Sequence, residues 1–163
     1  MARFQKLKVG EEYLLRLSRL EQEADKIVKR AVYEGAKVVA NAIKNEAENL
    51  PEEQFRKLGT GELFSGVTPH EKEAILQGFG LSDMEQDAQG WNTKAGFVGY
   101  VTRQKTKKYP RGTPVPMLVR SIESGSSVRR KIPFVRTAVK SSRGKAVEAM
   151  EDTIDEQVKK TMK

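Results

Sequence analysis

The side chains that proteins most often use for catalysis and metal binding are sparse in this chain of 163 residues. The sequence contains no cysteine and a single histidine, His70. A lone histidine has no second imidazole or thiolate with which to build the usual zinc site. We therefore predict that the chain has no metal site and that His70 is an ordinary surface residue in the first turn of a helix.

Neither acid pairs nor glycine-rich loops indicate an enzyme. General acid–base work by carboxylates needs burial to shift their pKa values. The adjacent acids lie in polar stretches and are read as solvated: Glu11-Glu12, Glu52-Glu53 and Glu151-Asp152. Gly59-Thr60-Gly61 is too short for a phosphate-binding loop and lacks the lysine that such a loop requires. We expect no catalytic residue and no cofactor.

Basic residues are the strongest chemical signal, and they are concentrated in one region. Residues 91–163 hold 17 Lys and Arg against 6 Asp and Glu, whereas residues 1–90 carry a small acidic excess. Such a region attracts phosphate or an acidic protein surface. The alternative interpretation is loop charge that faces only water. The candidate contact residues for a polyanion or protein partner are Arg103, Lys105, Lys107, Lys108, Arg111, Arg129, Arg130 and Lys131.

Three of these cations are consecutive, at 129–131, just before an apolar helix start. Because like charges repel, we expect them to face outward or to meet an acid. Glu123 is the single acid in residues 91–147. It is predicted to pair with Arg129 or Arg130, either within the chain or across a subunit boundary, where a surface pair contributes about 0–1 kcal/mol.

A long helix is predicted over residues 11–50, which is about a quarter of the chain. Its apolar residues recur at steps of three and four, which is the pattern of one helical face. Forty residues make a helix of about 60 Å, longer than a domain of this size is wide. One end is therefore expected to project or to meet a neighbour. Gly35 either permits close backbone approach or is simply tolerated.

Shorter elements follow this helix. Thr68, Pro69 and Glu71 are typical of a helix start, so a helix is predicted over 69–77. A β-hairpin region spans 78–102, with its turn at 86–90 and neither strand face cleanly polar, so both faces are expected to be covered. A basic loop follows at 103–113. A short helix closed by Gly125 and a C-terminal helix over 133–161, with a weak point at 141–144, complete the chain.

These elements predict an α+β fold in a single domain, 1–163, with a long N-terminal helix and a C-terminal helix packed on a small antiparallel sheet. The first residues lack the apolar core of a signal peptide, and no stretch approaches the roughly 18 apolar residues of a membrane span. A soluble protein without a membrane partner is expected.

Four pieces of sequence stand in an order that resembles a known family. They are TGEL at 60–63, GWNTKAGFVGY at 90–100, SIESGSS at 121–127 and IPFVRTAV at 132–139. In this order they are similar to the neck, or tail-component, proteins of tailed bacteriophages and PBSX-like defective prophages. The resemblance covers roughly residues 25–160. Ser124 departs from the pattern, because many relatives have an aromatic residue or histidine there.

The resemblance implies a structural protein of the virion neck, assembled in the host bacterial cytoplasm. It implies a homo-oligomeric ring, with six subunits as the first expectation and twelve as the second, that joins head to tail. Its partners would be a head-closure or portal-side protein and tail terminator or tail-tube proteins. In this interpretation Glu123 and Gly125 form a turn, and Pro133 and Phe134 anchor the last helix. The cations would meet either an acidic rim on an adjoining ring or DNA in the channel.

A different class of function also fits the charge. The basic region 91–147 is compatible with a nucleic-acid-binding protein that contacts phosphates without reading sequence. This alternative stays open at the level of sequence, as does the choice between DNA and protein as the partner of the cations.

Overall fold

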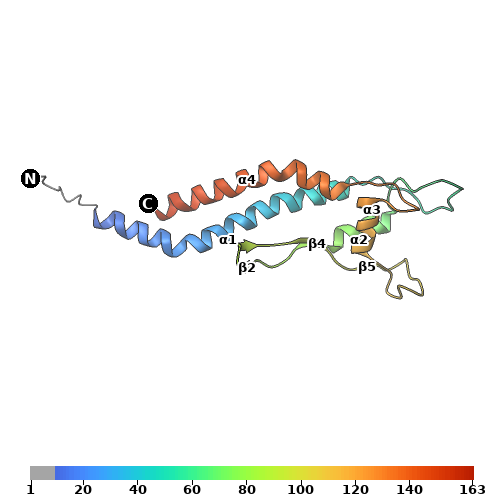
Figure 1. Ribbon diagram of the computed structural model, residues 1–163, viewed down its shortest axis with the longest axis horizontal. Helices are drawn as coiled ribbons and strands as arrows, with labels where there is room; N and C mark the ends of the chain where they lie inside the picture. The colour runs from blue at the N-terminus through green and yellow to red at the C-terminus, as the bar shows by residue number, and fades with distance from the viewer. Residues whose placement is uncertain (1–9) are drawn as a thin grey trace, which may run out of the picture.

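Two long antiparallel helices form the body of the molecule. The computed structural model describes residues 10–163. The expectation that the chain has no signal peptide concerns its first residues, most of which lie outside the described range. Helix α1 spans Glu11–Glu48 and helix α4 spans Phe134–Thr161. They lie side by side as a rod, with the C-terminus near the start of α1 (Figure 1).

Much of the rest of the chain gathers at one end of this rod, whereas strands β2 (Glu85–Asp87) and β4 (Ala95–Phe97) run back along α1 (Figure 1). Helices α2 (Pro69–Gly78) and α3 (Val115–Ser124) lie at that end with strands β5 (Tyr100–Val101) and β6 (Thr113–Pro114) (Figure 1). We call this part the head, and the opposite half of the α1–α4 pair the stalk. The expected projection of the first helix is confirmed in part, because its N-terminal half leaves the head but α4 accompanies it.

Gly35 lies where the two long helices approach closely. A Cβ built on Gly35 would collide with the Met150 side chain and would lie 3.2 Å from the Ala146 carbonyl oxygen. Ile27 and Ala31, on the same face of α1, are buried. Of the two interpretations of this glycine, close approach is therefore the one that the structure supports.

The hydrophobic core lies in the head, where the end of α1 meets α2, α3 and the beginning of α4. Residues Ile75 and Ile122 are fully buried, one from each short helix. Burial of this apolar surface stabilises the head, whereas much of the stalk stays in contact with water. The buried members of the core are Ile43, Ala47, Leu50, Val67, Ile75, Val101, Val115, Leu118, Val119, Ile122, Phe134 and Ala138.

Helix α2 begins as predicted. The Thr68 side chain accepts a hydrogen bond from the Glu71 N–H, and the Glu71 carboxylate accepts one from the Thr68 N–H. This reciprocal pair satisfies two backbone donors that a helix start otherwise leaves free. The helix ends at Gly78, whose missing side chain leaves room for the Val98 carbonyl.

The predicted hairpin is present but interrupted. Strand β1 (Phe79–Leu81) pairs with β4 (Ala95–Phe97), and β2 (Glu85–Asp87) pairs with β3 (Gly90–Asn92). With β5 and β6, this makes three separate two-stranded antiparallel sheets among the described residues. The α+β class is confirmed. The expectation that both hairpin faces are covered is wrong for β2, whose three residues are all exposed within the chain.

The hairpin is held along α1 by one aromatic side chain. The Trp91 indole N–H donates to Asp25 at 2.8 Å, and the Lys29 ammonium lies 4.6 Å from the centre of its ring. Near the head, Phe97 contacts both Phe79 and Phe134 through their rings.

Helix α4 begins where the sequence predicts, and its first residues anchor it. Phe134 is buried in the core, and Pro133 immediately precedes the helix. Gly125 ends α3 with φ +78°, a conformation that side chains disfavour, and so permits the turn. Helix α4 is continuous through 141–144, the expected weak point, where the Ser142 hydroxyl donates to the Ala138 carbonyl at 2.7 Å.

Candidate functional site

The basic loop lies at the far end of the head from both termini (Figure 1). It runs between β5 and β6, and Thr106 and Tyr109 close it with two backbone hydrogen bonds of 3.1 Å. Its five cations are exposed, and none forms an ion pair with a carboxylate of residues 10–163. They are Arg103, Lys105, Lys107, Lys108 and Arg111.

The three consecutive cations do not act as one cluster. Arg130 and Lys131 are exposed, but Arg129 is only 9% exposed. Of the two expectations for these cations, Arg129 therefore follows the second, since it meets an acid instead of facing outward, and its side chain is not available to a polyanion. The physical reason is that a buried carboxylate from another element of the head neutralises the charge of the Arg129 guanidinium.

Glu71 is that acid. Its carboxylate meets the Arg129 guanidinium at 2.9 Å and 3.1 Å and also accepts a hydrogen bond from Gln104 at 2.8 Å. Arg129 donates in addition to the Gly66 carbonyl. The pair thereby ties together the start of α2, the strap of residues 49–68, the basic loop and the chain before α4. Buried charges of this kind are tolerated only when they are paired and hydrogen-bonded.

Glu123 has a different partner from the one predicted. Its two carboxylate oxygens accept from the backbone N–H groups of Val135 and Arg136, each at 3.0 Å, and it pairs with the Arg136 side chain at 3.3 Å. The prediction that Glu123 pairs with Arg129 or Arg130 is therefore wrong within the chain. Glu123 acts as the missing cap of α4, because Pro133 offers no side-chain acceptor.

A groove of about 630 Å³ opens beside the buried pair. Its lining includes Phe55 and Phe64 of the strap, whose rings stack with their centres 6.0 Å apart, together with His70 and Arg103. Phe55 is 81% exposed, so it offers an apolar surface to water. His70 is exposed, as predicted, and its Nε2 contacts the Arg103 guanidinium.

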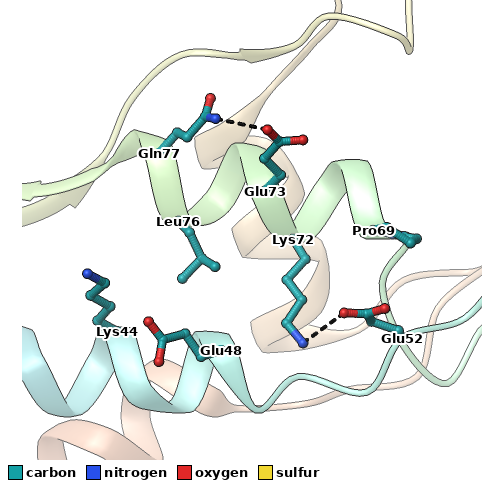
Figure 2. A pocket seen from close by; sticks show the side chains of 8 residues that line it. All are labelled: Lys44, Glu48, Glu52, Pro69, Lys72, Glu73, Leu76 and Gln77. Carbon is teal, nitrogen blue, oxygen red and sulfur yellow. Dashed lines mark hydrogen bonds and ion pairs between the residues drawn. The ribbon is translucent and has the colours of Figure 1, made fainter.

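A second hollow of about 550 Å³ separates the end of α1 from α2 (Figure 2). Lys44 and Glu48 extend from α1 towards Leu76 on α2, and the Lys72 ammonium meets Glu52 at 3.1 Å (Figure 2). Lys72 also donates to the Leu50 carbonyl at 3.1 Å. The Lys72 ammonium is thus neutralised by Glu52, which is typical of a structural contact.

One carboxyl group in the strap has a shifted pKa. A hydrogen bond from the Gly59 N–H, together with the Arg56 guanidinium at 2.6 Å, lowers the pKa of Glu62 below its ordinary value of 4.5. The same pair raises the pKa of Arg56. These contacts order the tip of the strap in which the TGEL piece lies.

The stalk carries two groups of charged residues, one on each long helix, that are not among the site residues predicted from the sequence. We call each group an edge. The basic edge of α1 consists of Arg19, Lys26, Arg30 and Lys37, and the acidic edge of α4 consists of Glu148, Glu151, Asp152 and Asp155. All but Lys37 are exposed, and Lys37 is partly exposed. The acidic edge is visible in the sequence, because its acids recur at helical steps of three and four, although two adjacent acids such as Glu151-Asp152 by themselves indicate only a solvated pair.

Within residues 10–163, no group of three or more His, Cys, Asp or Glu side chains could hold a metal ion. In the same range, no helix is long and apolar enough to cross a membrane. No protein-family model matches the chain, and comparisons with curated proteins and with solved structures find no match either.

Proposed function

We propose that this chain is a structural protein of the neck of a tailed-phage virion, in which copies close into a ring that joins the head to the tail. The four sequence pieces that carry the resemblance support this proposal. In the fold they occupy defined positions: the tip of the strap, the β3–β5 segment, the end of α3 and the start of α4.

The observation that carries the proposal is the apolar surface left open along the two long helices. Tyr13, Leu14 and Leu15 are each about half exposed. Large apolar side chains that recur along one exposed rod favour burial against other protein surface, and repeated copies in a ring supply such surface. The exposed apolar residues of α1 and α4 are Tyr13, Leu14, Leu15, Leu17, Val28, Tyr33, Val139, Val147 and Ile154.

In this proposal the protein is assembled in the bacterial cytoplasm and acts without catalysis. The ring has six subunits, or failing that twelve. One face of the ring meets a head-closure or portal-side protein, and the other meets tail terminator or tail-tube proteins. The exposed cations of the basic loop contact an acidic rim on one of these rings or the DNA that passes through the channel.

Negative-stain electron microscopy and native mass spectrometry of the purified protein test this proposal. We expect closed rings of uniform subunit number, either alone or after the neighbouring neck and tail proteins are added. A protein that stays strictly monomeric at high concentration and in the presence of those neighbours contradicts the proposal.

The basic loop favours a second candidate, a protein that binds nucleic acid without reading sequence. Five exposed cations without a carboxylate partner among residues 10–163 are available to phosphates. This candidate predicts binding to duplex DNA at low salt that weakens steeply as salt is added. Fluorescence anisotropy checks it, with Lys105→Glu/Lys107→Glu as the weakened variant and Lys159→Glu/Lys160→Glu as the control of equal charge. Undetectable binding at low salt refutes it.

A further inference from the structure

The two charged edges of the stalk face in different directions. Ile27, Ala31 and Gly35 turn towards α4, and Asp25 and Lys29 contact Trp91 of the hairpin. At 100° per residue, the basic edge, whose members are 7, 4 and 7 residues apart, occupies the remaining side of α1.

The acidic edge lies on the outer side of α4. Ser142 and Ala146 are buried on the inner side, and Met150 reaches Gly35 of α1. Glu148 and Asp155 lie about half a turn around the helix from this inner face. None of the four edge carboxylates forms an ion pair or a hydrogen bond with another side chain of residues 10–163. The α1–α4 rod therefore presents the four acids on the outer side of α4 and the four cations on a different side of α1.

The two edges also lie at the same height along the rod. Gly35 lies opposite Met150, and the Thr161 hydroxyl donates to Glu23 at 3.3 Å, so the antiparallel helices stay in step between these contacts. By this register Glu148 is level with about residue 37, and Asp155 is level with about residue 30.

The spacing of the charges matches as well. Seven residues separate Glu148 from Asp155, and seven separate Arg30 from Lys37, which is about 10.5 Å along either helix. A rotation about an axis parallel to the rod moves a copy sideways without changing its height. It therefore brings both acids of one copy level with both cations of the next.

We propose that these edges form the contact between neighbouring copies, with Asp155 of one copy facing Arg30 of the next and Glu148 facing Lys37. This inference rests on the proposed ring and names the surfaces that close it. The contact is head-to-tail, because each copy uses its acidic edge on one side and its basic edge on the other, and a repeated rotation closes it into a ring. Lys37 already meets Glu34 of its own helix at 2.7 Å, so Arg30 is the more available cation.

Two charge-reversed variants test the pairing. Glu148→Lys/Asp155→Lys reverses both acids of the proposed contact, and Arg30→Glu/Lys37→Glu reverses both of its cations. Each variant alone is expected to associate at least about tenfold more weakly than the wild type, because like charges then face each other. An equimolar mixture is expected to assemble, with the two variants alternating around a ring of even number.

Light scattering after size exclusion, and native mass spectrometry, measure assembly at about 0.15 M salt, where screening acts over about 8 Å. Glu73→Lys/Asp83→Lys is the matched control, because it makes the same change of charge at exposed positions away from both edges. It is expected to assemble like the wild type. Circular dichroism verifies folding, and Glu148→Gln/Asp155→Asn replaces the reversal if that variant unfolds.

The outcomes separate this inference from the proposed function. If the reversed variants form rings alone as the wild type does, or if folded variants fail to assemble when mixed, the edge pairing is wrong while the ring stands. If the wild type never forms a ring, with or without its neighbours, the proposed function fails and the inference fails with it. Assembly of the mixture, with neither variant assembling alone, supports both.

Discussion

At the residue scale, the buried pair of Glu71 and Arg129 is the contact whose loss is expected to matter most for stability. The side chains are 5% and 10% exposed. In Arg129→Ala the Glu71 carboxylate stays buried without its cation, and the Gly66 carbonyl loses a donor. We expect the free energy of unfolding to fall by about 3–5 kcal/mol, the usual effect of breaking a buried pair. Urea denaturation measures it.

The neighbouring Arg130→Ala is the matched control, because Arg130 is exposed. Its effect is expected to stay within about 0.5 kcal/mol. Equal stability of the two variants would show that Arg129 does not hold the head together. The sequence indicates the local role of Glu71 in starting α2, but not this pairing, because Arg129 lies 58 residues away along the chain.

Glu62 gives a prediction about pH at the same scale. Its pKa is lowered in the folded protein, first by the Gly59 N–H and then by Arg56. The carboxylate therefore stabilises the tip of the strap above the ordinary pKa of 4.5, and this contribution is lost as the pH falls through the lowered value. Carboxyl NMR titration is expected to place the pKa of Glu62 below 4.5.

Arg56→Ala distinguishes the two causes of this shift. Because the hydrogen bond from the Gly59 N–H remains in this variant, the pKa of Glu62 is expected to rise only part of the way back. A full return to 4.5 would assign the shift to Arg56 alone, and an unshifted pKa in the wild type would contradict the contact.

At the scale of elements, the start of α4 depends on a side chain from α3. Glu123→Ala removes the acceptor for two backbone N–H groups at the helix start, those of Val135 and Arg136. We expect a loss of about 0.5–2 kcal/mol in the free energy of unfolding, as for other lost helix caps. Thermal and urea unfolding followed by circular dichroism measure it.

Glu123→Gln is expected to recover part of this loss, because an amide oxygen still accepts one of the two hydrogen bonds. Ser124→Ala, at the exposed neighbouring position, serves as the control and is expected to leave stability unchanged. If Glu123→Ala behaves like Ser124→Ala, the cap does not contribute to holding α4 against α3.

At the scale of the whole molecule, substitutions at the end of the stalk are expected to affect association between copies but not the folding of one copy. Leu14 and Leu17 are 52% and 39% exposed, so a large part of each apolar side chain contacts water in a single copy. In Leu14→Gln/Leu17→Gln we expect weaker association, because less apolar surface is buried between copies, with an unchanged free energy of unfolding for the monomer. Analytical ultracentrifugation and urea denaturation measure the two quantities.

Ser18→Gln changes an exposed position in the same part of α1 and serves as the control. It is expected to alter neither quantity. Association that is unaffected by Leu14→Gln/Leu17→Gln would place the subunit contact elsewhere on the rod, and a large loss of monomer stability would show that these leucines belong to the fold itself.

Patterns within one element account for most of what could be predicted here. The helical spacing of apolar residues predicted α1 and α4 to within two residues at each end. Thr68 and Glu71 predicted the start of α2, and Gly125 predicted the end of α3. The interruption of the hairpin and the contact of Trp91 with Asp25 of α1 were not predicted, because neither follows from the alternation of residues along one strand.

The sequence by itself determined the helices, their caps and the concentration of basic residues, because hydrogen bonding and amphipathic spacing act over a few neighbouring residues. Only the tertiary structure decided which charges are available. In the folded chain Arg129 points inward and pairs with Glu71, and Glu123 accepts hydrogen bonds from the first turn of α4. The packing of α1 against α4 also places the acidic and basic edges at the same height. A charge takes its partner from whatever packing brings within a few ångströms, and packing joins residues that are far apart in the chain.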